Sequence, residues 1–365
     1  MKISVIAAKD LDDSHRAHWL ALQQRNPALL SPYFCPEFTM AVAGVKAGVR
    51  VAILEERGEV VGYLPYEQEW GAGRPVGCPL SDHHGVIAAP DTVIEWPLLL
   101  RRTNLAYWKF DHLVAAQSPH EEERLAVSPG LDLSRGFQAW KAGRIAVGGR
   151  RVGELDRKAR KLAREVGPLR FEAHVDDRAV LATVLRLKSE QCRRSGISDI
   201  FATPWTRALV DGLRHMDTPH FAGRLSALYA GDHLVAAHFG MRSDRAWHWW
   251  FPVYDHAHAK HSPGALLLLH TAEAAAVAGM QVLDLGKGDD VYKGSFADWS
   301  LPLVEGCVTR PALRTAARDA RLTAVRWLKT SPLVQPLRPV WRSLRGFDRA
   351  SARTADQISA KMTTE

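Results

Sequence analysis

The stretch AWHWWFPVYDHAHAKHSPGALLLLHTAEAAAVAGMQVLDLG, residues 246–286, holds the pattern that decides the fold. It begins with a run of aromatic and apolar residues over 246–254, which is typical of a buried strand. A polar loop that ends in Ser-Pro-Gly leads into a predicted apolar helix over 265–279, and a further strand is predicted over 281–286. Free backbone N–H groups and the positive end of the helix dipole meet at the start of that helix, which suits a pyrophosphate group.

The loop before this helix supplies the residues that we expect to bind the phosphate. Gly264 lets the backbone approach a phosphate closely, and Lys260 and His261 add charged donors. Many helices begin with Ser-Pro-Gly as a simple cap, so the spacing alone leaves a structural role equally open. The predicted cofactor-binding residues are Lys260, His261, Ser262, Gly264 and Ala265.

The rest of the chain alternates strands and helices, which predicts a mixed α/β architecture. Two strands around a short polar turn occur in each half, at 49–70 and at 222–243, and this indicates a structural duplication. Strands are predicted over 1–8, 49–56, 59–70, 107–116, 169–174, 222–230, 233–243, 246–254, 281–286 and 301–309, and helices over 14–25, 90–102, 150–167, 177–196, 205–216 and 265–279.

The length of 365 residues exceeds what one compact core usually serves, so we expect two domains of roughly 150 residues each. The segment 128–149 is rich in glycine and turn residues and is predicted to be the linker between them. The predicted domains are an N-terminal domain over 1–149, a C-terminal domain over 150–309 that carries the cofactor loop, and a basic tail over 310–365.

The cysteines and the apolar stretches indicate the cell compartment. Four cysteines lie far apart without a CxxC spacing, which argues against a disulfide framework and a zinc cluster. The N-terminus lacks the apolar region and cleavage site of a signal peptide. The most apolar stretch, 265–280, is interrupted by His270 and Glu273 and is too short to span a bilayer. We therefore expect a cytoplasmic protein with reduced cysteines and no metal.

The positive charge is concentrated near the C-terminus. Residues 310–356 carry eleven basic and three acidic residues, an excess equal to the net charge of +8 of the whole chain. The remainder is neutral and gives no reason to expect a nucleic-acid groove. Residues 311–330 predict an amphipathic helix that begins at a proline. This tail is interpreted either as a helix on the body followed by disorder, or as a peripheral contact with an anionic membrane face or polymer.

Two polar segments are candidates for the chemistry. The segment LDLGKGDDVYKGSF (283–296) places Lys293 together with Asp284, Asp289 and Asp290 at the end of a strand, where proteins present functional groups. The segment SDHHG (81–85) places Asp82 beside two imidazoles, an arrangement that orients and tunes a general base. We favour Asp82 and His84 as residues of a cleft between the domains, with a structural turn as the alternative. Adjacent residues cannot all converge on one ion, which argues against a metal there.

The order of elements resembles the acyl-CoA-binding core of the GNAT acyltransferases: a two-stranded hairpin, a third strand, a phosphate-cradling loop with its helix, and a further strand. His261-x-x-Gly264-x-Leu266 stands where that superfamily has Gln/Arg-x-x-Gly-x-Gly/Ala. Several ordered segments are also similar to the CelD-like acetyltransferases of cellulose and exopolysaccharide biosynthesis, a family related to the Fem-type enzymes with two tandem GNAT domains. These segments are SPYFCPEF (31–38), GYLPYEQ (62–68), RPVGCPLSDHHGVI (74–87), RKARKLAREVG (157–167), LKSEQCRRSG (187–196), HSPGALLL (261–268) and LDLGKGDDVYKGSF (283–296).

The resemblance covers about residues 30–308 and implies a tandem GNAT fold, with mixed, mostly antiparallel sheets flanked by helices. It also implies roles for several residues. Tyr292 and Lys293 match the Tyr/Phe-Lys pair beside the acceptor site, where Lys293 would hold an anionic part of the acceptor or stabilise charge on the thioester oxygen. Asp284 would orient Lys293 or act as a base, and a structural pair of the two in a turn is the alternative. Trp249 and Tyr254 on the aromatic strand would wall the acyl or sugar pocket, or pack in the core.

The function expected from these observations is transfer of an acyl group, with acetyl as the expected group, from acetyl-CoA or another acyl-CoA to an amine or hydroxyl. The acceptor would be a small-molecule or lipid-linked sugar precursor of a polysaccharide or of the cell envelope. No cysteine has the context of a nucleophile, so we expect direct attack in a ternary complex. One alternative is an aminoacyl-tRNA-dependent transferase, in which the basic run 157–165 would touch tRNA. The other is a non-catalytic scaffold at a membrane-bound synthase.

Overall fold

The computed structural model describes residues 1–119, 124–288 and 291–310. In the first segment, two long strands meet at Arg57 and Gly58, both of which have positive φ as a tight hairpin turn requires. The strands predicted over 49–56 and 59–70 are confirmed. The elements of this part are β1 (Lys2–Ala7), α1 (Asp13–Arg25), α2 (Pro36–Val45), β2 (Val49–Glu56), β3 (Glu59–Glu69), β4 (Ala72–Arg74), β5 (Ile87–Ala88), α3 (Trp96–Arg102) and β6 (Tyr107–Val114).

The second part of the chain contains the predicted aromatic strand, loop, helix and strand. The aromatic strand is confirmed with the predicted bounds, and the apolar helix begins two residues earlier, at Pro263. The elements are β7 (Arg124–Asp132), α4 (Phe137–Ala146), α5 (Arg150–Glu165), β8 (Leu169–Glu172), α6 (Arg178–Arg194), α7 (Pro204–Arg214), β9 (Ala222–Ala230), β10 (His233–Arg242), β11 (Ala246–Tyr254), the 3₁₀ turn η6 (His256–His261), α8 (Pro263–Val277), β12 (Val282–Asp284), α9 (Val291–Phe296) and β13 (Trp299–Thr309).

Several segments differ from the sequence prediction. The elements α2, β4, β5 and β7 were not predicted, and the helix predicted over 90–102 begins only at Trp96. The predicted linker, 128–149, is wrong, because most of it lies in β7 and α4 and places Leu131 and Trp140 in the core. The predicted loop after β12 contains the short helix α9. The predicted domain boundaries stay a prediction. The basic tail lies outside the described residues, apart from Arg310 at its start.

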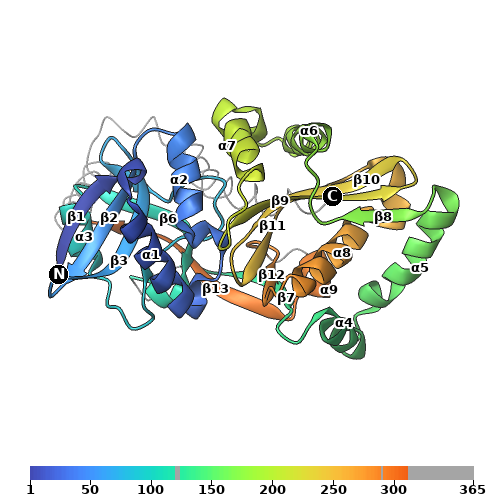
Figure 1. Cartoon of the computed structure of the whole chain (residues 1–365), viewed down its shortest axis with the longest axis horizontal. Helices are drawn as coiled ribbons and strands as arrows, with labels where there is room; N and C mark the ends of the chain where they lie inside the picture. Colours follow the sequence, from blue (N-terminus) through green and yellow to red (C-terminus); the bar gives the residue numbers. More distant parts are fainter. Residues whose placement is uncertain (120–123, 289–290, 311–365) are drawn as a thin grey trace, which may run out of the picture.

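The strands of the described residues form a single sheet (Figure 1). Their order is β1-β2-β3-β4-β6-β13-β7-β12-β11-β10-β9-β8, and β5 pairs with β3. Neighbouring strands run antiparallel apart from two parallel pairs, β4 with β6 and β11 with β12. The sheet therefore matches the predicted fold class. The last strand, β13, crosses from one half to the other and lies between β6 and β7.

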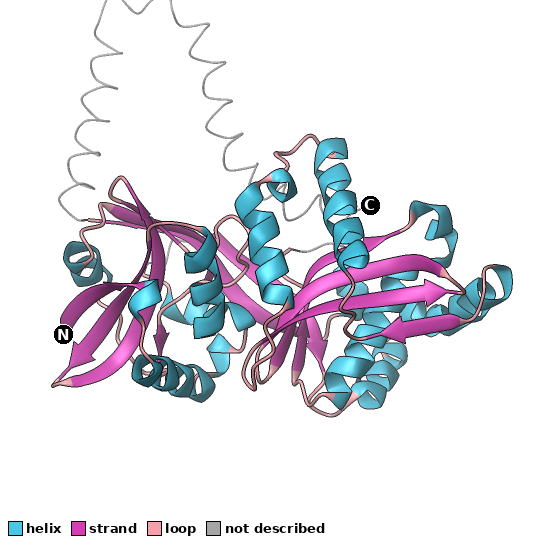
Figure 2. Ribbon diagram, turned by 45° about the horizontal axis from the view of Figure 1, so that its top comes forward, coloured by secondary structure: helices cyan, strands magenta, loops and turns pink. Residues whose placement is uncertain are grey.

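Helices cover the sheet on both faces (Figure 2). Apolar side chains fill the layers between the helices and the sheet. In the second part, α6 and α7 pack on one face of β9, β10 and β11, whereas α8 packs on the other. The core under α6 and α7 continues into the first part, where Phe38 from α2 belongs to the same cluster as Phe251 from β11. This shared core holds the two parts together and fixes the loop between β4 and β5 against β11.

No helix within the described residues combines the length and the apolar character that a membrane crossing requires.

Candidate functional site

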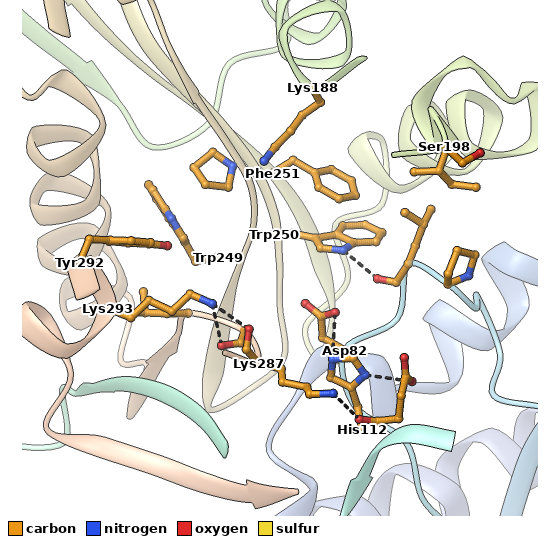
Figure 3. A pocket seen from close by; sticks show the side chains of 17 residues that line it. Asp82, His112, Lys188, Ser198, Trp249, Trp250, Phe251, Lys287, Tyr292 and Lys293 are labelled. Atoms are coloured by element: carbon orange, nitrogen blue, oxygen red, sulfur yellow. Dashed lines mark hydrogen bonds and ion pairs between the residues drawn. The ribbon is translucent and has the colours of Figure 1, made fainter. Parts of the chain in front are cut away.

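A cavity of about 160 Å³ lies where two neighbouring strands separate (Figure 3). β11 and β12 pair in parallel from Ala246 with Val282 to His248 with Asp284. β11 then continues to Tyr254, whereas the chain after β12 turns away at Gly286, which has a positive φ of 75°. The residues that line the cavity are Pro79, Leu80, Asp82, Asp111, His112, Lys188, Ser198, Ile200, Trp249, Trp250, Phe251, Pro252, Leu285, Gly286, Lys287, Tyr292 and Lys293.

One wall of the cavity is aromatic and comes mainly from β11. The indole N–H of Trp250 donates to the carbonyl of Leu80 at 2.9 Å, which ties the loop before β5 to this strand. Trp249 stacks on the ring of His238 with ring centres 4.0 Å apart. Tyr292 from α9 faces the same cavity. This wall suits the apolar face of an acyl group or a sugar ring.

The opposite wall carries a carboxylate and an imidazole in contact. His112 on β6 places Nδ1 3.0 Å from the Asp111 carboxylate, and its Nε2 lies 3.7 Å from Asp82 Oδ1. Burial acts to raise the pKa of Asp111, but the neighbouring His112 outweighs it, and the pKa is lowered below its ordinary value. Neither ring nitrogen of His112 has an aligned hydrogen-bond partner among the described residues, and a carboxylate lies beside each of them. An imidazole next to a carboxylate in a cavity wall is the pairing that general bases use.

Behind Asp82 lies a buried chain of charged groups. Asp82 Oδ2 is 2.9 Å from His248 Nε2, and the other ring nitrogen of His248 is 3.7 Å from Asp284 Oδ2. Burial lowers the pKa of His248, but its contacts with Asp284 and Asp82 outweigh burial and raise the pKa to about 9. Ser128 Oγ donates to Asp284 Oδ1 at 2.6 Å, and the backbone N–H of Gly286 donates to the same oxygen at 2.8 Å. Asp284 therefore positions His248 rather than facing the cavity.

Three lysines border the cavity, and each is almost fully buried. Lys293 Nζ donates to the carbonyls of Gly286 and Lys287, at 3.2 and 2.8 Å, so it holds the turn after β12. Lys287 pairs with Glu305 and donates to the carbonyl of Asp111. Lys188 from α6 lies 3.2 Å from the side-chain oxygen of Gln191, and burial lowers its pKa to about 8.

The predicted cofactor loop lies at the other end of β11. Lys158 from α5 donates to Ser262 Oγ at 2.6 Å, and Glu165 pairs with Lys260 at 2.8 Å and with His261 at 3.2 Å. A Cβ added to Gly264 would lie 3.4 Å from the ring of Tyr254, an ordinary van der Waals contact. Tyr254 therefore belongs with this loop and is not among the residues that line the cavity.

The structure brings the residues predicted from sequence into three places. The cavity wall holds Asp82, Trp249, Tyr292 and Lys293, and Asp284 lies behind it. His84 is also behind the wall, because Ser81 binds its Nε2 at 3.1 Å and burial lowers its pKa to about 3. The third place is the loop with Lys260, His261, Ser262, Gly264, Ala265 and Tyr254. Asp289 and Asp290 lie outside the described residues.

Sequence reasoning missed four residues of this site: Lys188, Asp111, His112 and His248. The segment FDHLV (110–114) offered a signal, because an Asp-His pair interrupts an otherwise apolar strand. His248 stands inside the aromatic run that was used only to predict a strand. Neither signal showed that the two histidines face the same aspartate, Asp82.

Comparisons with known proteins bear on the fold. Residues 149–294 match the family model described as an acetyltransferase (GNAT) domain. The search of curated proteins found no match. Among solved structures, the chain is similar to FemX, with 10% identity over 87% of this chain and 99% of that chain and a TM-score of 0.56. L-PGS from Bacillus licheniformis has 9% identity over 81% and 92% of the chains and a TM-score of 0.50. A tandem GNAT protein from the clavulanic acid biosynthesis pathway has 12% identity over 85% and 98%, with a TM-score of 0.47.

The fold is therefore GNAT-like, and residues 149–294 are similar to GNAT acetyltransferase domains. This makes the protein an acyltransferase, as the sequence predicted. The solved structures share the fold at about a tenth of identical residues, so they carry no information about the substrate. The narrower resemblance to the CelD-like family stays a prediction.

Proposed function

We propose that the protein transfers an acyl group, in the first instance acetyl, from acyl-CoA to an amine or hydroxyl of a sugar-containing acceptor. The observation that carries this proposal is the cavity between β11 and β12, which joins an aromatic wall to the Asp111–His112 pair. A volume of about 160 Å³ is about five times that of one water molecule in the liquid. Such a space favours a short acyl group beside the reacting end of the acceptor.

The reaction proceeds by direct attack in this proposal. The acceptor hydroxyl or amine lies against His112 Nε2, which takes its proton as the new bond to the thioester carbon forms. The carbonyl π electrons move to the oxygen, and the tetrahedral intermediate then expels the CoA thiolate, which receives the proton from His112. Past His248, β11 has no β12 partner among the described residues, so backbone N–H groups on that edge can stabilise the oxyanion.

The donor is assigned to the loop at the end of β11. Lys158, Lys260 and Ser262 gather at the start of α8, a helix of fifteen residues whose N-terminus attracts phosphate. The salt bridge between Lys260 and Glu165 is exposed to solvent and contributes little to stability, so a diphosphate can displace it. The pantetheine arm would then run along β11 from this loop toward the cavity.

Calorimetric titration with acetyl-CoA and longer acyl-CoAs tests the donor. We expect saturable binding that Gly264→Asp removes, because an added carboxylate at the start of α8 repels a diphosphate. The matched control is Gly212→Asp, since Gly212 is an exposed helical glycine on α7 with open space around it. Binding of no acyl-CoA, or equal binding by both variants, would contradict the donor assignment.

A second candidate is transfer of an aminoacyl group from an aminoacyl-tRNA, which is compatible with the fold likeness to FemX. The observation that favours it is α5, a basic helix that reaches the donor loop through Lys158. RNA binding that falls steeply with salt, together with no binding of acyl-CoA, would support this candidate. A scaffold without catalysis is the remaining alternative, and acyl transfer that depends on His112 would exclude it.

The sugar acceptor rests on the resemblance to CelD-like proteins and on the aromatic wall. Trp249 and Trp250 offer an apolar surface for a ring, while Asp82 and His112 can bind its hydroxyl groups from the other side. We propose that the protein acts in the cytoplasm, where acyl-CoA is made, and a contact of the basic tail with a membrane face would bring it to a lipid-linked acceptor.

A further inference from the structure

Three buried side chains behind the cavity direct their ligand atoms at one point. His83 comes from the loop before β5, His248 from β11 and Asp284 from β12. His83 Nε2 lies 3.2 Å from Asp284 Oδ2, and His248 Nδ1 lies 3.7 Å from the same oxygen. The three ligand atoms are all within 4.8 Å of one another, and the side chains are 0%, 0% and 3% exposed.

The outer atoms of His248 and Asp284 have hydrogen-bond partners, whereas the outer nitrogen of His83, Nδ1, is buried without an aligned partner among the described residues. His83 Nε2 and His248 Nδ1 are buried and have no aligned hydrogen-bond partner among the described residues. On the outer side, Asp82 binds His248 Nε2, and Ser128 and the N–H of Gly286 bind Asp284 Oδ1. Buried polar atoms without a partner are rare in proteins, so two of them that face one carboxylate oxygen require an explanation.

We propose that His83, His248 and Asp284 bind a Zn²⁺ ion. Zinc bonds of 2.0–2.2 Å in a tetrahedron place neighbouring ligand atoms about 3.4 Å apart, which matches the two separations from Asp284. Two imidazoles and one carboxylate are ligands that zinc prefers over calcium or magnesium. The Asp82 contact on the outer nitrogen of His248 is the carboxylate–histidine–metal arrangement that fixes a ligand ring.

The neighbouring cluster of His84, Asp111 and His112 is a weaker site, although its ligand atoms are also close together. His84 uses both ring nitrogens elsewhere, because Ser81 binds Nε2 and the backbone N–H of His112 donates to Nδ1 at 3.3 Å. The adjacent residues His83 and His84 therefore point into different clusters. Only in the first of these two clusters do both central imidazole nitrogens lack an aligned hydrogen-bond partner.

The ion would join the two parts of the protein. His83 belongs to the first part, and both other ligands belong to strands of the second part. Zinc at this place would fix the loop that carries Asp82 at the cavity wall.

Zinc binding by the full-length chain tests the proposal independently of acyl transfer. After removal of metals with a chelator, ZnCl₂ is titrated in competition with a chromophoric chelator, and we expect one equivalent per chain. His83→Asn should weaken binding at least about 100-fold, since a ligand matters more than the outer contacts that are worth 10–100-fold. The matched control is His84→Asn, the same change at the next residue, and it should keep the wild-type affinity within a few-fold.

A milder variant separates loss of zinc binding from loss of folding. Ser128→Ala keeps all three ligands and removes one outer hydrogen bond, so it should bind zinc 10–100-fold more weakly. Circular dichroism of each stripped variant verifies that the chain is folded. A wild-type chain that takes up no equivalent, or a folded His83→Asn variant that binds as tightly as wild type, would overturn the proposal. Loss of binding in His84→Asn with retention in His83→Asn would overturn it too, because the second cluster would then hold the ion.

Discussion

Lys188 makes the protein less stable than a hydrophobic residue at the same place would. Its side chain is 2% exposed and donates a hydrogen bond to the side-chain oxygen of Gln191, and among the described residues it forms no ion pair with a carboxylate. Burial lowers the pKa from 10.5 to about 8. The unfolded chain therefore holds this proton more tightly than the folded chain does, and the charged lysine opposes folding.

The shift sets the size of the effect. A fall from 10.5 to about 8, at 1.36 kcal/mol for each unit, makes the charged side chain unfavourable by about 3 kcal/mol at pH 7. The penalty is complete below pH 8 and is lost as the pH rises from 8 to 10.5, because the folded chain loses its proton first and the unfolded chain follows. Stability from this group thus increases with pH in that window, and under about 1 kcal/mol of the penalty remains at pH 10.

Lys188→Met removes the charge and keeps a side chain of similar length. By the usual unfolding entropy per residue, 3 kcal/mol corresponds to a rise in Tm of about 4 °C for 365 residues. Calorimetry at pH 7 and pH 10 measures the Tm of both proteins. The Tm of the variant should exceed that of wild type by about 4 °C at pH 7 and by about 1 °C at pH 10. Lys9→Met, at an exposed lysine, should change neither value. A variant that is less stable at pH 7, or a gap that does not narrow at pH 10, would refute the argument.

Three further predictions concern the site and the core. His112→Gln should lower kcat about 100-fold or more with little change in KM, and steady-state kinetics with a saturating acyl donor measures this. An unchanged kcat would exclude His112 as the base. Trp140→Ala should lower the free energy of unfolding by about 3–5 kcal/mol in denaturant titration, because the indole is 3% exposed. Gly286→Ala places a methyl group 3.1 Å from Asp82 at a φ of 75°, so it should reduce both activity and thermal stability, the latter by about 1–2 kcal/mol. A Trp140→Ala or Gly286→Ala variant as stable as wild type would contradict the close packing described for that residue.

Local sequence patterns predicted most of the strands and helices. Alternation and aromatic content located β2, β9 and β11 with the bounds that the structure has. The segment 128–149 was misread because its glycines and turn residues resemble a linker. Leu131 and Trp140 become buried only when β7 pairs with β12 and β13 and α4 packs beside them. Those contacts connect residues more than a hundred positions apart, so no local pattern contains them.

The candidate site was predicted only in part, because some of its residues also meet through long-range contacts. Short polar segments at strand ends identified Asp82 and Lys293, which line one cavity. The Asp111–His112 pair lies inside β6. A strand pattern predicts that residues pack in a sheet and does not indicate which of them line a cavity. His112 meets Asp82 because the loop at residue 84 pairs with β6 at Leu113. That bridge is a tertiary contact, and periodicity cannot reveal it.

The position of β13 has a consequence for how the protein is made. During synthesis, β6 and β7 leave the ribosome long before their common neighbour, so each presents an open edge of unpaired backbone groups in what becomes the middle of the sheet. The sheet closes only after residue 309 has emerged. A chain cut short before Trp299 would keep both edges open, and we expect such fragments to aggregate or to need a chaperone, whereas a chain that ends at 310 keeps every strand of the sheet that the described residues form.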